Sequence, residues 1–345
     1  MKAARIHRHG DVDVIHVDEV APPPCAPDEV VVGVRAAALN HLDIWVRTSE
    51  RFALTMPHTI GSDAAGVVER VGERVSTVEV GQAVIINPSL SCGRCEFCRR
   101  GEQSLCSTFA IVGTGRSGTF AQQVAVPARN VLPKPDCLSF EQAAALPIAY
   151  VTAWRMLMSR ARLLPGEWVL IHGIGGGVAL AGLQLAKLAG ATVIVTSGDN
   201  DKLARAAELG ADHALNYRTV GDLAAAVGEL TGGRGVDVAF DTVGAATWAL
   251  DFAVVRRGGR IVLCGVTTGA AAPTDLRALY WNQLTVLGST SGSHEDFRQL
   301  LAAMTAGRIQ PVIDSVHPLA DVRQACRRME KGQQFGKIIL TMPRD

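Results

Sequence analysis

The sequence has little of what marks membrane, secreted or nucleic-acid-binding proteins. No stretch approaches the ~18 consecutive apolar residues of a membrane helix, and the start of the chain lacks the apolar segment of a secretory signal. Lys and Arg number 34 and Asp and Glu number 33, so the net charge of +1 provides no field for a phosphate backbone. We expect a cytoplasmic protein that acts on a small molecule and binds neither membrane nor nucleic acid.

The overall composition is that of a globular protein. Of the 345 residues, 48% are apolar and 19% are charged, which excludes a disordered chain. At about 100–200 residues per domain, the length predicts two domains with sizeable cores.

The eight cysteines are unevenly placed. Four stand alone, whereas Cys92, Cys95, Cys98 and Cys106 follow the spacing C-x2-C-x2-C-x7-C. Four thiolates in a short lobe suit a tetrahedral zinc ion and leave no open coordination position, so such a site is structural. Disulfides fit the expected compartment poorly, and the spacing differs from that of bacterial ferredoxins, although an iron–sulfur cluster stays chemically possible. We predict one structural Zn²⁺ per chain, in a lobe over 91–107.

The pattern of secondary structure changes near residue 135. Before it, short apolar runs separated by Gly and Pro predict an irregular β domain, for example over 30–35, 66–71 and 83–86. After it, predicted strands and helices alternate from 168 to 264, which indicates βαβ units and a parallel sheet. A helix over 294–305 and a strand over 337–340 follow. The fold class is therefore α/β.

A glycine-rich turn lies between a predicted strand and a predicted helix. The run from Gly173 to Ala179, which includes Gly176, Gly177 and Val178, reads as G-x-x-G-x-x-A. It lies where backbone N–H groups and a helix N-terminus receive a pyrophosphate. A loop needed only for turning is the alternative. We predict a dinucleotide site, and its expected contacts also include Val243 and Gly265.

The end of the next strand bears on the type of cofactor. An NAD site usually has an acid there that bonds the ribose 2′-OH. Here Ser197 occupies the position, and Lys202, Tyr217 and Arg218 could supply charge and stacking for a 2′-phosphate. This favours NADPH over NADH, although Asp199 and Asp201 could still approach a ribose.

Together these motifs resemble the medium-chain dehydrogenase/reductase superfamily, which contains zinc alcohol dehydrogenases and quinone oxidoreductases. The markers occur in the family's order along essentially the whole chain: the four-cysteine lobe, the glycine turn, Gln184–Lys187, Glu208–Asp212, Thr231–Asp237, Asp241–Gly244, Gly258–Arg260 and Phe335–Leu340.

The resemblance implies a fold and an assembly. Residues 1–135 and 291–345 would form a GroES-like, β-rich catalytic domain, and 136–290 a Rossmann domain with a doubly wound parallel sheet. Members of the family are commonly dimers or tetramers. The segment 284–288 resembles the strand that joins two Rossmann sheets, so a homodimer or homotetramer is expected.

The sequence departs from the zinc alcohol dehydrogenases at each position of their catalytic metal site. Asn40 stands in the place of the first ligand, a cysteine, and Ser62 in the place of the second, a histidine. The stretch over 146–149 offers no third ligand. We therefore predict no catalytic zinc. A different site built from His41, His58, Asp43 and Asp63 is the chemical alternative.

Without a Lewis acid, alcohol oxidation loses its means of stabilising an alkoxide, whereas hydride transfer to an acceptor that delocalises charge stays available. The sequence indicates NADPH-dependent reduction of an activated C=C bond or a quinone, as does the family resemblance of Asn40–Asp43 to the N-x-x-D segment of quinone and enoyl reductases. The alternatives are an alcohol dehydrogenase or ketone reductase without an orthodox metal, and a non-catalytic NADPH-binding protein.

The candidate catalytic residues come from two short segments. His41 is the first candidate for proton donor or oxyanion partner because the pKa of an imidazole lies near neutrality. A packed or outward-facing histidine is the alternative. Asn40 and Ser62 are secondary hydrogen-bond candidates. Trp45, Arg47 and Trp281 are candidates for the lining of a substrate cleft.

Overall fold

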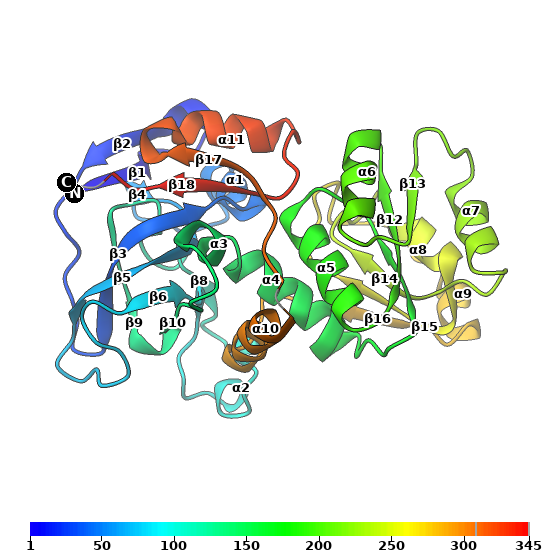
Figure 1. The fold of residues 1–345 in the computed structure, drawn as a ribbon, viewed down its shortest axis with the longest axis horizontal. Coiled ribbons are helices and arrows are strands. Elements are labelled where there is room, and N and C mark those ends of the chain that lie inside the picture. Colours follow the sequence, from blue (N-terminus) through cyan, green and yellow to red (C-terminus); the bar gives the residue numbers. More distant parts are fainter. Residues whose placement is uncertain (308, 344–345) are drawn as a thin grey trace. The chain divides into compact units, whose positions relative to one another are not determined.

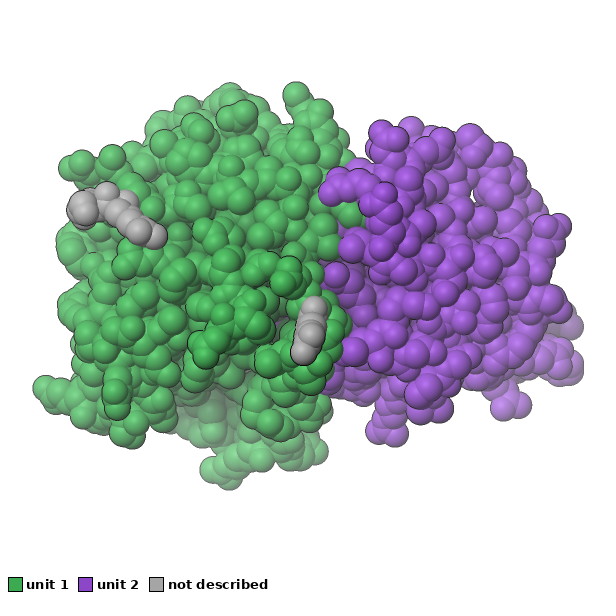
Figure 2. All heavy atoms as spheres, in the orientation of Figure 1, with its two compact units in different colours: residues 1–149, 292–345 green, residues 150–291 purple. Residues whose placement is uncertain are grey.

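A computed structural model describes residues 1–307 and 309–343. The chain divides into two compact units, coloured separately in Figure 2. Unit 1 contains residues 1–149 and 292–345, and unit 2 contains residues 150–291. No helix in the described part of the chain is both long enough and apolar enough to cross a bilayer.

Unit 1 is built on β-sheets (Figure 1). A seven-stranded sheet has the order β10-β6-β5-β3-β18-β17, with β9 also pairing with β3. A three-stranded sheet has the order β2-β1-β4, and β7 pairs with β8. The strands are β1 (Lys2–Ile6), β2 (Ile15–Glu19), β3 (Glu29–Ala38), β4 (His58–Thr59), β5 (Asp63–Val71), β6 (Ala83–Ile86), β7 (Ser89–Leu90), β8 (Ala110–Ile111), β9 (Gln123–Pro127), β10 (Val131–Pro133), β17 (Ile313–Pro318) and β18 (Lys337–Thr341).

The last strand of the chain returns to the centre of this sheet. β18 pairs antiparallel with β3, with Ile339 opposite Ala38, and parallel with β17. This pairing places the C-terminal strand beside the start of the first helix. The helices of unit 1 are α1 (His41–Thr48), α2 (Glu96–Arg99), α3 (Phe140–Ala144), α10 (His294–Gly307) and α11 (Val322–Glu330).

Unit 2 is a six-stranded parallel sheet of order β13-β12-β11-β14-β15-β16. Its strands are β11 (Trp168–Ile171), β12 (Thr192–Ser197), β13 (His213–Asn216), β14 (Val236–Asp241), β15 (Val255–Leu263) and β16 (Thr285–Gly288). Its helices are α5 (Gly177–Leu188), α6 (Asn200–Glu208), α7 (Leu223–Leu230), α8 (Trp248–Val254) and α9 (Leu276–Trp281). Helix α4 (Pro147–Trp154) contains the boundary between the units.

The strand order is that of a Rossmann sheet, in which the first and fourth strands lie side by side. Every residue of β14 is buried, as expected for a parallel strand covered on both faces. The α/β fold class with a GroES-like domain and a Rossmann domain is confirmed. The predicted helix over 294–305 corresponds to α10, which extends to Gly307.

The boundaries of the two units fall after residues 149 and 291, whereas the predicted domain boundaries fall after residues 135 and 290. Residues 136–149, assigned by sequence to the Rossmann domain, belong to unit 1. The physical reason is α3, which packs against β3 and β5 of the large sheet and buries Ala143 and Ala144. A helix of five residues is too short for its apolar pattern to indicate which sheet it will cover.

Candidate functional site

The four clustered cysteines come together as predicted. The sulfur atoms of Cys92, Cys95, Cys98 and Cys106 all lie within 4.8 Å of one another, and those of Cys92 and Cys98 are 3.9 Å apart. A tetrahedron with Zn–S distances of about 2.3 Å has edges of about 3.8 Å, whereas sulfurs in a disulfide are bonded at about 2.05 Å. The donor set and its spacing therefore fit a structural zinc.

Hydrogen bonds around the sulfurs support the thiolate form that a metal needs. The backbone N–H of Cys92 and the hydroxyl of Thr108 lower the pKa of Cys106 to about 6. The backbone N–H of Cys98 lowers the pKa of Cys95, while burial raises that of Cys98 to about 11. A bound dication would compensate for this burial, because metal binding favours deprotonated ligands.

The start of α1 contains a buried polar network. Asn40 precedes the helix, and its side-chain amide donates to Asp63 Oδ2 over 2.9 Å and accepts from Lys337 Nζ. Asp63 is fully buried, and its other carboxylate oxygen accepts from the Ile148 backbone N–H over 2.9 Å. Asn40 is only 8% exposed. Its amide is therefore committed to β5 and β18.

Asp43 adds a second buried carboxyl group to this network. It accepts a hydrogen bond from the backbone N–H of Asn40 over 2.7 Å, which fixes the first turn of α1. Burial raises its pKa to about 7, and the negative charge of Asp63 adds to the effect. Asp43 and Asp63 thus share one nearby cation, Lys337.

His41 and Ser62 lie at the edges of the same network. His41 is the first residue of α1 and its side chain is exposed. Surrounding protein atoms and the positive charge of Lys337 lower its pKa, so the neutral imidazole is favoured at pH 7. Ser62 directly precedes Asp63 and is 1% exposed.

The predicted role of Arg47 in a substrate cleft is wrong. Its side chain is 1% exposed, donates to the backbone carbonyl of Gly10 over 2.6 Å and pairs with Glu330 of α11. This ion pair joins α1 to α11, and the arginine side chain is buried although Glu330 is partly exposed. Trp45 lies on the same helix under the guanidinium of Arg51, and Trp281 of α9 is largely exposed.

The residues considered for an unorthodox metal site do not converge. Among the described residues, the cysteine cluster is the only group of three or more His, Cys, Asp or Glu side chains placed to share an ion. The His58 ring nitrogen Nε2 lies 2.9 Å from the Gly113 carbonyl. The ammonium of Lys337 lies against Asp63, where it would repel a metal cation.

The glycine turn in unit 2 has the backbone of a phosphate-binding loop. It connects β11 to α5, and Gly176 is the N-cap residue of that helix. Gly173 and Gly175 have φ values of +64° and +118°, and a Cβ on Gly175 would lie 2.9 Å from the Cδ of Lys202. Gly175 therefore permits both the turn and the approach of a lysine. The helix N-terminus and the cation suit a pyrophosphate.

The end of β12 is surrounded by the residues that the sequence suggested for a 2′-phosphate. A Cβ on Gly198 would lie 2.6 Å from Arg218 Nε and 2.8 Å from the Tyr217 hydroxyl. Asp199, the nearest acid, uses one carboxylate oxygen to cap α6 by accepting from Lys202 N and Asp201 N. Ser197 is buried and its hydroxyl accepts from the Asp199 N–H.

The remaining predicted cofactor residues follow β14 and β15. Val243 lies in a turn fixed by Asp241, whose carboxylate accepts the N–H groups of Val243 and Gly244 over 2.6 and 3.1 Å. A Cβ on Gly173 would lie 3.4 Å from Val243, so this turn borders the glycine turn. Gly265 follows β15 with φ of +82°. Both occupy the edge formed by the carboxyl ends of the strands.

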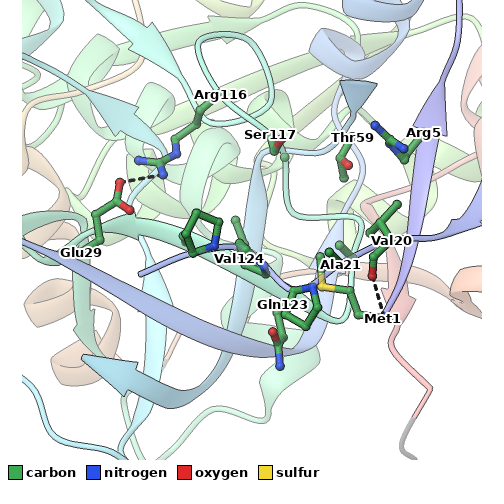
Figure 3. Close-up of a pocket in the computed structure, with 16 residues that line it drawn as sticks. Met1, Arg5, Val20, Ala21, Glu29, Thr59, Arg116, Ser117, Gln123 and Val124 are labelled. Atoms are coloured by element: carbon green, nitrogen blue, oxygen red, sulfur yellow. Dashed lines mark hydrogen bonds and ion pairs between the residues drawn. The ribbon is translucent and has the colours of Figure 1, made fainter. Parts of the chain in front are cut away.

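A cavity of about 490 Å³ opens in unit 1 away from these residues (Figure 3). Its walls include Arg5, Thr59, and the ion pair between Arg116 and Glu29. None of the predicted catalytic, cofactor or metal residues lines it. We assign it no part in the chemistry.

Comparison with known proteins identifies the family. The zinc-binding dehydrogenase model matches residues 177–306, and the alcohol dehydrogenase GroES-like domain model matches residues 26–136. The chain belongs to the medium-chain dehydrogenase/reductase superfamily. It is therefore an oxidoreductase of this family.

Its relatives in this superfamily differ in activity. A crystal structure of an NAD-dependent alcohol dehydrogenase is 41% identical, with a TM-score of 0.95 over 99% of this chain and 100% of the other. Crotonyl-CoA carboxylase/reductase of Cereibacter sphaeroides is 31% identical, covering 96% and 84%. Quinone oxidoreductase of Homo sapiens is 29% identical, covering 99% and 98%.

Sequence analysis missed two buried groups. Lys337 was read only as part of a family marker, because nothing in the sequence reports that β18 returns beside α1. His172 directly precedes the glycine turn and pairs with Asp251 over 2.8 Å, with both side chains buried. A polar residue at the end of an apolar run was the available signal for His172.

Proposed function

We propose that this oxidoreductase reduces an activated C=C bond or a quinone with NADPH and without a catalytic metal. The observation that carries the proposal is the network at Asn40. The positions aligned with two zinc ligands hold an amide and a hydroxyl, and the amide is bound by the ammonium of Lys337. The names of the enoyl and quinone reductase relatives support the same class of reaction.

NADPH supplies the hydride, which goes to the electrophilic carbon of the acceptor. The residues of unit 2 bind the cofactor, with the glycine turn and the N-terminus of α5 holding the pyrophosphate. In unit 1, we assign His41 the role of hydrogen-bond donor to the acceptor oxygen on which negative charge develops. A neutral imidazole N–H donates a hydrogen bond to the enolate oxygen and stabilises its charge, while the proton that completes the reduction comes from solvent. Asn40 becomes a positioning residue, because its amide is already engaged.

The role of His41 is tested by substitution with alanine. We expect His41→Ala to lower kcat by about 10²-fold or more, since loss of one hydrogen-bond donor to a developing oxyanion costs about 10²–10³-fold. The Kd for NADPH should stay within about twofold, because the cofactor contacts lie in unit 2. Steady-state kinetics and fluorescence titration measure the two quantities. His317→Ala, on β17, is the matched control. Unchanged turnover in His41→Ala removes the residue from the mechanism.

The preference for NADPH is proposed from the surroundings of Gly198. Arg218 and Tyr217 lie against this glycine, and Lys202 follows on α6. We expect Arg218→Ala to weaken NADPH binding about 10-fold and to leave NADH binding nearly unchanged, since the guanidinium would pair only with the 2′-phosphate. Arg257→Ala, on β15 of the same unit, is the control. Equal losses for both cofactors contradict the assignment.

An alcohol dehydrogenase or ketone reductase is the second candidate, favoured by the 41% identity to the NAD-dependent alcohol dehydrogenase. A panel of enals, enones, quinones, alcohols and ketones, run with NADPH and NADH on protein of known zinc content, separates the two. Reduction of enones or quinones with about one zinc per chain supports the proposal. Alcohol oxidation with about two zinc ions per chain supports the second candidate. Cofactor binding without turnover on any compound of the panel supports a non-catalytic role.

We further propose a homodimer formed through β16. This strand is at the edge of the Rossmann sheet, and its residue Val286 is exposed. The neighbouring helix α9 exposes Leu276, Tyr280 and Trp281. An unpaired edge beside exposed aromatic side chains is suited to pairing with a second copy of the chain. Pairing of two such dimers would give the homotetramer that the family resemblance also allows. No disulfide joins any of the eight cysteines, which supports the cytoplasm as the compartment.

A further inference from the structure

A buried lysine connects three elements of unit 1. Lys337 lies on β18 and is 3% exposed. Its Nζ donates to the carbonyl of Leu39 over 2.7 Å, to Asn40 Oδ1, and to Asp63 Oδ2 over 3.1 Å. An ammonium group has three hydrogens to donate, so all of them are used within the protein. Lys337 therefore has no donor left for a substrate.

Loss of any partner of the buried Lys337 ammonium would strongly destabilise this network. A buried ammonium loses its hydration and is tolerated only where partners replace the lost water, so removing one partner leaves an uncompensated buried charge. Asp63 supplies the opposite charge from β5 and is itself held by the N–H of Ile148. Three partners thus hold the ammonium: the carbonyl of Leu39, which follows β3, the side chain of Asp63 on β5, and the side chain of Asn40, which precedes α1.

The position of Asn40 links this network to the proposed reaction. Asn40 immediately precedes His41, the first residue of α1. Its backbone N–H is bound by Asp43 and its side chain by Lys337 and Asp63. The direction in which α1 leaves the sheet, and with it the location of His41, therefore depends on these three contacts.

We infer that Lys337 is a positioning residue, whose buried ammonium fixes Asn40 at the start of α1 and thereby places His41 for its reaction. The inference rests on the proposed role of His41. In this inference Lys337 does not contact the substrate and instead orients His41, which does. Such orientation matters because a displacement of about 1 Å at a reacting group can lower the rate about 10²-fold.

The same charge also acts on His41 through space. The charged groups of the network are Lys337 from β18, Asp63 from β5, and Asp43 from α1 itself. Desolvation by surrounding protein atoms and the charge of Lys337 lower the pKa of His41. Coulomb's law predicts that removal of the lysine raises this pKa and that removal of the negative charge of Asp63 lowers it further. A loss of packing would instead move the pKa of His41 toward its ordinary value of about 6.5 in both variants.

The test measures the titration of His41 by NMR in the full chain labelled with ¹³C-histidine, and the signal lost in His41→Gln gives the assignment. We expect Lys337→Met to raise the pKa of His41 by about one unit and Asp63→Asn to lower it. Lys134→Met is the matched control, since Lys134 also donates to backbone carbonyls in unit 1, those of Pro135 and Leu138. It should leave the His41 titration unchanged.

Kinetics with the substrate of the wild type provide the second readout. We expect Lys337→Met to lower kcat about 10²-fold with an unchanged KM for NADPH, and Lys337→Arg to restore part of the loss. A rise of the His41 pKa in Asp63→Asn, or equal effects of Lys337→Met and Lys134→Met, overturns the inference. If Lys337→Met does not fold, the direction of the shift in Asp63→Asn decides alone. If the wild type reduces none of the panel, the proposed function fails, and the titration still decides the role of Lys337.

Discussion

The roles of individual residues in this protein depend on which charged and polar groups are buried beside them. Asp43 and Asp63 are both acids near α1, yet Asp63 is paired with Lys337, whereas burial raises the pKa of Asp43 to about 7. The sequence identifies both as acids but does not show which of them has a cation beside it. It could propose His41 as a candidate from imidazole chemistry alone, but it could not show that Asn40 is already engaged.

Asp43 should make the stability of the protein depend on pH. Its pKa is about 7 in the folded state and 3.8 in the reference state, so the folded protein binds the extra proton between these values. The free energy of unfolding should therefore fall as pH rises through this window, by up to about 1.4 kcal/mol per pH unit from this group. Asp43→Asn keeps an oxygen for the Asn40 N–H and removes the titration.

Urea unfolding of the wild type and of Asp43→Asn at several pH values between about 5 and 8 measures this effect. We expect the stability difference between the two proteins to grow in favour of the variant as pH rises, and to level off above the pKa of Asp43. The difference cancels titrations that both proteins share, including those of the cysteine lobe. A difference that stays constant over this range contradicts the raised pKa.

At the scale of elements, short segments here depend on groups outside themselves. Helix α2 has only four residues, too few to be stable alone, and it carries Cys98 and follows Cys95. The glycine turn likewise holds its shape between β11 and α5, two elements that the apolar periodicity predicted. Sequence spacing suffices to predict a site when one continuous segment provides all of its residues, as the cysteine lobe does.

Loss of one thiolate should empty the zinc lobe. We expect Cys95→Ser protein to contain nearly no zinc, against about one ion per chain in the wild type, because the lobe supplies only the four donors that tetrahedral zinc needs. Elemental analysis by mass spectrometry measures the content, and limited proteolysis should show cleavage within 91–107. The exposed Cys137 lies outside the lobe, so Cys137→Ser should keep its zinc. Retention of the metal in Cys95→Ser would refute the four-sulfur site.

At the scale of the whole molecule, edge strands in both units expose apolar residues. β16 ends the sheet of unit 2 and exposes Val286, and β17 ends the large sheet of unit 1 and exposes Val316. Exposure alone does not distinguish them. The apolar side chains of α9 accompany β16, and the family resemblance of 284–288 favours the same edge.

A charge placed on β16 should therefore block assembly. We expect Val286→Lys to convert the oligomer into monomers, or tetramers into the next smaller species, because a lysine on an edge strand disfavours pairing. Light scattering coupled to size-exclusion chromatography measures the mass. Val316→Lys is the control on β17 and should leave the mass unchanged. If both variants keep the wild-type mass, the interface lies elsewhere on the molecule.

The sequence by itself determined the fold class, the cysteine lobe and the glycine turn, because each depends on periodicity or spacing within one short segment. The tertiary structure decided that Arg47 joins α1 to α11 and that residues 136–149 pack with unit 1. It also decided that Lys337 binds Asn40 and Asp63. These contacts join residues far apart in the chain, and only the pairing of β18 with β3 brings a terminal lysine to the start of α1.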